Sequence, residues 1–220
     1  MARTVTIDGP AGVGKTTLAK RLAEHLNVGY MDTGAMYRGV AWYAGAGAWD
    51  WEEGRLKKVL QGMEFSLSGS GQNTILSLNG NPLDDRIRTE EVGMRASNMA
   101  KLPVVRDFLK KAQQRLGEKV SLVAEGRDMG TVVFPQAENK FFLDATPRVR
   151  AERRWAQLEE MGQKENFHTI LETIQKRDQQ DRNRKTAPLR PAEDAHVIDT
   201  GNKDIYEVFA EMLDCIRIGS

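Results

Sequence analysis

Apolar and polar positions follow two periods along this chain, one typical of strands and one typical of helices. Short runs that are typical of strands occupy residues 4–8, 30–31, 120–124, 140–143 and 196–198, and those at 120–124 and 140–143 are nearly all apolar, as in strands buried on both faces of a parallel sheet. Between these runs, apolar residues recur at helical spacing over about 18–26, 105–116, 147–161, 167–184 and 205–216. Strands that alternate with helices predict an α/β fold, with a five-stranded parallel sheet flanked by helices.

One stretch departs from this alternation. From Met63 the period changes to two, and Asn79-Gly80 is a strong hairpin turn signal. Residues 63–85 are therefore expected to form a small antiparallel insert, too small to fold alone. A short helix is expected just before it, from Trp49 to Leu60.

The most informative polar segment follows the first predicted strand. Gly9, Gly14, Lys15 and Thr16 fit the phosphate-loop pattern G-x-x-x-x-G-K-[ST]. Small residues let successive backbone N–H groups turn toward a phosphate, and the following helix adds its favourable dipole. The pattern predicts that Lys15 binds the β- and γ-phosphates of a nucleotide and that the Thr16 hydroxyl binds Mg²⁺.

Three further polar clusters accompany the phosphate loop. They cover residues 32–38, 125–131 and 177–184, and each is expected to lie at or after the end of a strand. Ligands of open α/β sheets bind at the carboxyl ends of the strands, so these clusters are candidates for a second ligand site. Any one of them alone could be an ordinary solvated surface with ion pairs.

Composition narrows the class of protein. The chain has 220 residues and a net charge of +1, which argues against a nucleic-acid partner. Cys215 is the only cysteine, so a disulfide framework and a cysteine-based metal site are both excluded, and a reducing cytoplasm is expected. No apolar run reaches membrane-spanning length, and we expect a monomer without a membrane partner.

The sequence resembles the bacterial cytidylate (CMP) kinases, a branch of the nucleoside monophosphate kinases, from Thr4 to the C-terminus. The most specific stretches are residues 7–10 joined to the phosphate loop, 32–38, 126–135 and 181–184. This resemblance implies a P-loop NTPase core in a single domain, residues 1–220. The core would comprise about 1–32, 103–147 and 190–220, the monophosphate-binding segment with its β insert about 33–102, and the lid about 148–189.

The resemblance also implies roles for individual residues. ATP would be bound by Gly9, Pro10, Ala11, Gly12, Val13, Gly14, Lys15, Thr16, Thr17 and Arg153. CMP would be bound by Thr33, Tyr37, Arg38, Ser97, Arg106, Arg127, Asp128, Arg177, Asp181 and Arg184. Lys15, Arg127 and Arg184 would be the catalytic residues, and Mg²⁺ would contact Thr16 directly and Glu125 through water.

The expected reaction is transfer of the γ-phosphoryl group of MgATP to CMP and dCMP. The acceptor would be a phosphate monoester that is already largely dianionic at neutral pH, so the reaction needs cations rather than a general base. Two alternatives stay open: a kinase for another monophosphate such as UMP, and a GTP-dependent switch. Against the switch, the chain has no D-x-x-G sequence, and Asn202-Lys203-Asp204 lacks the N-K-x-D spacing.

Overall fold

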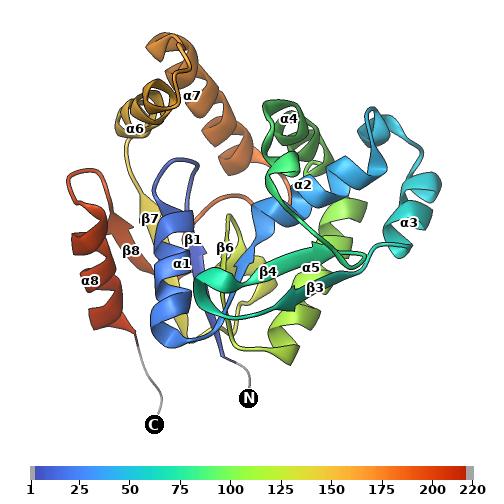
Figure 1. Cartoon of the computed structure of the whole chain (residues 1–220), viewed down its shortest axis with the longest axis horizontal. Helices are drawn as coiled ribbons and strands as arrows, with labels where there is room; N and C mark the ends of the chain where they lie inside the picture. The colour runs from blue at the N-terminus through green and yellow to red at the C-terminus, as the bar shows by residue number, and fades with distance from the viewer. Residues whose placement is uncertain (1–2, 217–220) are drawn as a thin grey trace. The chain divides into compact units, whose positions relative to one another are not determined.

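A computed structural model describes residues 3–216 of the chain. Its main sheet has five strands in the order β2-β6-β1-β7-β8, all parallel and flanked by helices, which confirms the predicted α/β class (Figure 1). The strands are β1 (Thr4–Asp8), β2 (Gly29–Asp32), β6 (Leu122–Gly126), β7 (Asn139–Asp144) and β8 (His196–Asp199). Every residue of β6 is buried, as expected where helices cover both faces of a parallel sheet.

The described chain divides into two compact units. The first comprises residues 3–4 and 20–125, and the second comprises residues 5–19 and 126–216. Helix α1 (Lys15–Leu26) begins in the second unit and continues into the first. No helix within residues 3–216 is long and apolar enough to cross a membrane.

In the first unit, β2 and β6 pair in register from Gly29 opposite Leu122 to Asp32 opposite Glu125. Helix α2 (Thr33–Ala44) follows β2 directly, and the Asp32 carboxylate caps it by accepting a hydrogen bond from the Ala35 amide at 2.9 Å. Helices α4 (Glu90–Met99) and α5 (Pro103–Lys119) complete this unit together with α3 (Glu53–Gln61). The carboxyl end of β2 thus leads into a capped helix.

The antiparallel insert is confirmed. It consists of β3 (Phe65–Ser68), β4 (Ile75–Leu78) and the short β5 (Asn81–Pro82), and β3 packs against α5 (Figure 1). Asn79 and Gly80 both have positive φ, 50° and 76°, as the hairpin turn requires. The Phe65 and Phe108 rings, 6.4 Å apart, join the insert to α5.

Two predicted boundaries were wrong. The helix expected from Trp49 to Leu60 is a short 3₁₀ turn (Ala48–Asp50) followed by α3, because Trp51 and Glu52 are extended between them. In that conformation the Trp51 ring lies 3.8 Å from the Arg55 guanidinium, a cation–π contact. The strand expected at 120–124 instead covers Leu122–Gly126, because α5 continues to Lys119 and Val120 caps it.

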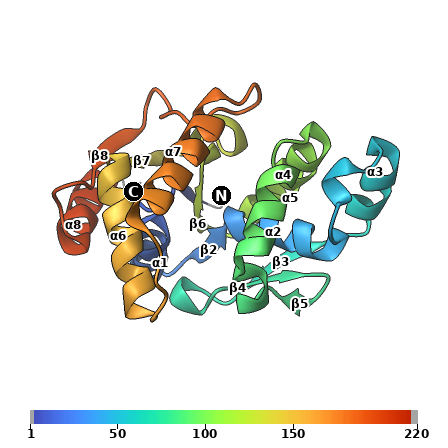
Figure 2. The same cartoon turned by 90° about the horizontal axis from the view of Figure 1, so that it is seen from above.

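In the second unit, β1 and β8 both pair with β7, and α8 (Ile205–Cys215) follows β8. Helices α6 (Pro147–Glu160) and α7 (Phe167–Asn183) form the antiparallel pair seen beside each other in Figure 2. They pack through a core of their own, formed by Ala151, Leu158, Ile170 and Ile174 with Phe167 and Leu171 against it. This helix pair corresponds to the segment predicted as a lid.

Candidate functional site

The predicted phosphate loop joins β1 to α1 in the second unit. Gly9, Gly12 and Gly14 all have positive φ, 147°, 84° and 88°. A Cβ at Gly9 would lie 2.1 Å from the Leu143 carbonyl oxygen, so no larger residue fits there. These backbone angles are accessible to glycine at little cost, which explains the residue types of the motif.

The charged and hydroxyl groups of the motif lie at the start of α1. Lys15 is buried, and its Nζ donates a hydrogen bond to the Pro10 carbonyl oxygen at 2.6 Å, across the loop. Thr16 and Thr17 are exposed in the first turn of α1. A helix N-terminus with an ammonium group and reachable hydroxyls is suited to binding a phosphate.

A buried carboxylate connects β1 to the segment that follows β6. Asp8 accepts hydrogen bonds from the amides of Met129 at 2.9 Å and Gly130 at 2.8 Å. Burial raises the pKa of Asp8 to about 6, and the charge of Asp128 acts in the same direction, while the two amides and Lys15 oppose it. Asp8 therefore fixes the backbone immediately after Arg127 and Asp128.

This segment has an unusual backbone. The amides of Val133 and Phe134 donate to the carbonyl oxygens five residues earlier, of Asp128 and Met129, at 3.2 and 2.7 Å, so Met129–Val133 forms one π-helical turn. Such turns are rare and are found frequently at functional sites.

Four of the predicted CMP ligands form one ionic cluster in the second unit. Arg127 Nε lies 3.0 Å from the Asp181 carboxylate, and Arg184 lies 3.6 Å from Asp181 and 3.5 Å from Asp128. The side chains of the two arginines are 19% exposed, so both can be reached by a ligand. Two guanidinium groups held together at the end of β6 and α7 match the geometry that phosphate recognition needs.

Two other predicted residues lie on the helix pair. Arg177 is exposed on α7 and lies one turn before Asp181, on the same helix face. Arg153 on α6 donates hydrogen bonds to both the side-chain and the backbone oxygen of Thr200, after β8. Arg153 is therefore bound to the connection between β8 and α8 and is not a free surface side chain.

In the first unit, further predicted CMP ligands lie on α2, α4 and α5. Arg106 is 7% exposed, donates to the Ala100 carbonyl oxygen at 3.4 Å, and has its guanidinium 6.0 Å from the centroid of the Tyr37 ring. Ser97 is exposed on α4. Tyr37 and Arg106 are therefore brought together, as expected for neighbours in one site.

Arg38 is held by backbone carbonyls. Its Nη1 donates to the carbonyl oxygens of Ile87 at 3.2 Å and Thr89 at 3.3 Å, and the missing side chain of Gly93 leaves room for it. Burial lowers the pKa of the Arg38 guanidinium, an effect that Asp32 opposes. An arginine remains charged in spite of such a shift, so Arg38 is a fixed cation.

Thr33 and Glu125 are joined at the carboxyl ends of β2 and β6. The Thr33 hydroxyl donates to the Glu125 carbonyl oxygen at 2.7 Å, and the Tyr30 hydroxyl donates to the buried Glu125 carboxylate. Across residues 3–216, no group of three or more acidic, histidine or cysteine side chains could hold a metal ion alone. The Thr16 hydroxyl is an oxygen donor of the kind that Mg²⁺ prefers, and Mg²⁺ commonly binds to few protein ligands together with substrate phosphates.

Residues 5–218 match the protein family described as "Cytidylate kinase". The chain belongs to the cytidylate kinase family. The cytidylate kinase of Maridesulfovibrio salexigens is 59% identical over 95% of this chain and 94% of its own length. Those of Oleidesulfovibrio alaskensis (56% identity, 97% of both chains) and Nitratidesulfovibrio vulgaris (54%, 98% of this chain and 93% of the relative) are similar over the same extent.

This membership confirms the family resemblance seen in the sequence. The roles of the individual residues remain predictions. The resemblance also implies that Arg38, Arg127 and Arg184 together bind the acceptor phosphate, and this too remains a prediction, because Arg38 belongs to the first unit and Arg127 and Arg184 to the second. The division into core, monophosphate-binding segment and lid likewise remains a prediction.

Three residues of this cytidylate kinase family member were not assigned a role from the sequence. Asp8 is an acidic residue at the end of a buried strand, and such a position in the sequence indicates a carboxylate with a structural or functional role. Arg88 lies 3.7 Å from Asp32, beside Arg38. Arg150 is almost fully buried on α6, and its position next to Ala151 on the apolar stripe of that helix was the available signal.

Proposed function

We propose that this chain transfers the γ-phosphoryl group of MgATP to CMP and dCMP, giving ADP and CDP or dCDP. The observation that carries the proposal is the pairing of a glycine-rich phosphate loop with the cluster of Arg127, Asp128, Asp181 and Arg184, in a member of the cytidylate kinase family. One nucleotide accounts for the phosphate loop. A second phosphate accounts for the additional arginines.

Catalysis by this site depends on charge neutralisation. Two polyanions must approach each other, and negative charge must be stabilised on the transferring phosphoryl group. Lys15 at the phosphate loop and Arg127 and Arg184 in the ionic cluster supply fixed positive charge for this. Mg²⁺, bound through Thr16 and the phosphates, would supply further positive charge, and no general base is needed because the acceptor is already ionised.

The choice of base is proposed to depend on Asp128. Cytosine carries an amino donor at N4 and an acceptor at N3, so an ionised carboxylate facing N4 and an arginine facing N3, Arg106, complement it. A carboxylate has about four lone-pair positions, so its pairing with Arg184 at 3.5 Å leaves capacity for a further donor. Uracil would place its O4 acceptor against the carboxylate, at a cost of about 1–3 kcal/mol.

We further propose that the enzyme acts as a monomer in the cytoplasm, where its nucleotide substrates are found and where a single unpaired cysteine is typical. No partner beyond the small-molecule substrates is needed for this reaction.

The test is a phosphoryl-transfer assay with MgATP and CMP, dCMP, UMP, AMP or GMP, run on the natural chain, Asp128→Ala and Asp107→Ala. Asp107 is an exposed carboxylate on α5, so its variant controls for the loss of a charge. We expect CMP and dCMP to be the best acceptors, and Asp128→Ala to reduce the ratio of CMP to UMP activity about tenfold. UMP as the best acceptor, or an unchanged ratio in Asp128→Ala, would contradict the assignment.

A further inference from the structure

We propose that Arg150 is a positioning residue for the phosphate loop: it sets the orientation of the Ala11–Gly12 peptide and connects that peptide to α7 through Asp178. The inference rests on the proposed function only in that the loop must bind MgATP. It concerns a residue for which neither the sequence motif nor the family name gives a role.

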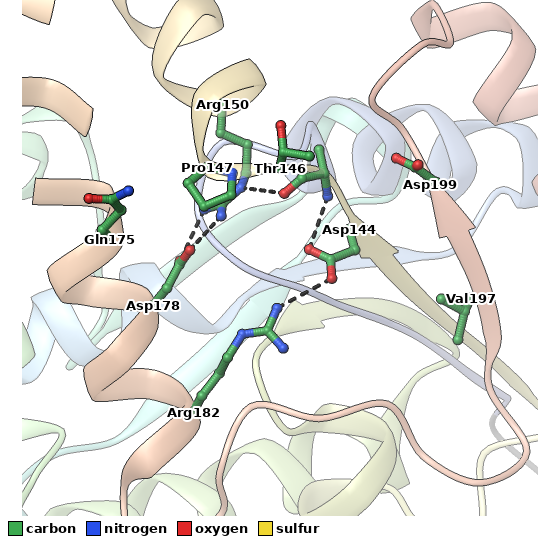
Figure 3. A pocket seen from close by; sticks show the side chains of 10 residues that line it. Asp144, Thr146, Pro147, Arg150, Gln175, Asp178, Arg182, Val197 and Asp199 are labelled. Carbon is green, nitrogen blue, oxygen red and sulfur yellow. Dashed lines mark hydrogen bonds and ion pairs between the residues drawn. The ribbon is translucent and has the colours of Figure 1, made fainter. Parts of the chain in front are cut away.

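The contacts of Arg150 reach three separate segments. Its side chain is 1% exposed, and its Nε donates to the Ala145 carbonyl oxygen at 2.9 Å. Its Nη1 donates to the Ala11 carbonyl oxygen at 3.1 Å. Nη1 also donates to Asp178 Oδ1 at 3.0 Å, and Nη2 donates to Asp178 Oδ2 (Figure 3). The phosphate loop, the start of α6 and the middle of α7 therefore share one guanidinium group.

The contact with Ala11 determines where the next amide points. In a trans peptide the C=O and N–H bonds point in opposite directions, and no described peptide bond here is cis. A carbonyl of Ala11 that faces Arg150 therefore turns the Gly12 N–H away from Arg150. In a phosphate loop this is the side on which the amides converge on the ligand.

The stem of Arg150 also supports the loop sterically. A Cβ built at Gly12 would lie 3.2 Å from the Arg150 Cβ, so a larger residue at this position would press against the stem of Arg150. Gly12 has a φ of 84°, a conformation that other residues rarely adopt. Arg150 thus binds the loop at Ala11 and lies close to Gly12, where only glycine leaves room for it.

Asp178 gives the arrangement its rigidity. It is 9% exposed, binds the guanidinium through both carboxylate oxygens, and lies beside Arg150 on the wall of a cavity of about 560 Å³ (Figure 3). A bidentate pair fixes the plane of the guanidinium, and so fixes the direction of the bond to Ala11. Movement of α7 is thereby coupled to the orientation of a loop peptide.

The alternative is that the Arg150–Asp178 ion pair only stabilises the fold and does not position the phosphate loop. The known energetics of buried ion pairs distinguish these two hypotheses. Removing only Asp178 leaves a buried, uncompensated charge, which destabilises the fold, whereas replacing both partners by apolar residues can be neutral. The double variant therefore restores stability in either case. It restores MgATP affinity only if Arg150 has no role in positioning the loop.

The experiment measures the Kd of a non-hydrolysable MgATP analogue and, separately, of CMP by calorimetry. We expect Arg150→Met to weaken analogue binding about tenfold, as for the loss of one charged hydrogen bond, with the Kd of CMP changed less than twofold. Arg148→Met is the matched control, because Arg148 is on the same helix, its side chain is 79% exposed, and it contacts only Glu152 among the described ion pairs. It should leave both affinities unchanged.

Two further variants make the result decisive. Arg150→Lys keeps the charge but cannot reach three partners from one planar group, so we expect only partial recovery of analogue affinity. Arg150→Met with Asp178→Leu should recover the unfolding midpoint lost in Asp178→Leu yet still bind the analogue about tenfold more weakly than the natural chain. This double variant also provides the measurement if Arg150→Met alone does not fold.

The outcomes distinguish this inference from the proposed function. If Arg150→Met or the folded double variant binds the MgATP analogue with the same Kd as the natural chain, the positioning role of Arg150 is wrong. Failure of the natural chain to bind the analogue at all would instead overturn the proposed function.

Discussion

At the scale of single residues, Asp8 illustrates how a buried charge is used to hold a loop. Its carboxylate is 4% exposed and accepts two successive amides, those of Met129 and Gly130. Desolvation disfavours the ionised form, but only a carboxylate offers both N–H groups an acceptor without a competing donor. The arrangement keeps Arg127 and Asp128 at a fixed distance from the start of the phosphate loop.

Burial raises the pKa of Asp8 from 3.8 to about 6. Between pH 3.8 and about pH 6, Asp8 is therefore protonated in the native state and ionised in the unfolded chain. The contribution of Asp8 to the unfolding free energy therefore falls as the pH rises from about 4 to about 6, by an amount on the order of 3 kcal/mol, and is constant above it. Asp8→Asn does not titrate and lacks this contribution. Urea unfolding of both proteins from pH 4 to pH 7 measures the difference, and parallel stability profiles would contradict the shift.

Many of the residues in the site could be identified from the sequence because they belong to short, contiguous patterns. The phosphate loop, the Arg127-Asp128 pair and the Asp181–Arg184 turn are each specified within a few positions. The Asp8–Met129 and Arg150–Ala11 bonds join residues 121 and 139 positions apart, so no local pattern contains them. Such contacts depend on how strands and helices pack, which the order of residues in one segment does not define.

At the scale of elements, the sequence predicted well those segments whose period is regular and long. The amphipathic helices α5, α6, α7 and α8 and the alternating strands of the insert are of this kind. The break at Trp51 and Glu52 and the π-helical turn at Met129–Val133 were not predicted. A cation–π contact between Trp51 and Arg55 accompanies the break, and hydrogen bonds to the buried Asp8 carboxylate hold the π-helical turn. Local periodicity carries no information on either.

The turn of the insert provides a test of backbone strain. Gly80 has a φ of 76° with no atom within 4 Å of a built Cβ, so Gly80→Ala should cost about 1 kcal/mol of unfolding free energy through strain alone. Gly54 is also unobstructed but lies in α3, where alanine is favoured, so Gly54→Ala should raise the unfolding free energy by about 0.5 kcal/mol. The same chemical change thus has opposite signs at two sites. Urea denaturation measures both, and equal effects would refute the strain argument.

Helix α7 has two charged faces with different expected roles. Arg177 and Asp181 lie one turn apart on one face, and Asp178 and Arg182 lie on the next. Arg184 follows the helix as its C-cap and lies 3.6 Å from Asp181. We expect Arg184→Ala to lower kcat about 100-fold while weakening CMP binding less than tenfold, because charge on the transferring group develops only in the transition state. Arg182→Ala, which removes an exposed cation paired with Asp144, is the control and should change neither value. Equal losses in kcat and in CMP affinity for Arg184→Ala would argue against a lid role.

At the scale of the whole molecule, each unit contributes a different kind of group. The second unit holds the phosphate loop and the cluster of Arg127 and Arg184, and the first holds Arg38, Tyr37 and Arg106. The sequence predicted three polar clusters at or after strand ends. Residues 32–38 and 125–131 do lie at the carboxyl ends of β2 and β6, but residues 177–184 lie in α7 and its C-cap, so that part of the prediction was wrong. The order of the strands in the sheet was not predicted, since it depends on crossover connections between distant segments.

A reaction that uses both sets of groups should depend on the presence of both nucleotides. Water is always available as a competing acceptor, so a site that serves CMP must transfer little until CMP is bound. We expect ADP release from MgATP to be at least about 100-fold slower without CMP than with saturating CMP. A coupled assay of ADP release, with GTP replacing ATP in parallel reactions, measures this dependence. Equal rates with and without CMP would indicate a nucleotide hydrolase, and hydrolysis that prefers GTP would favour a GTP-dependent switch over a cytidylate kinase.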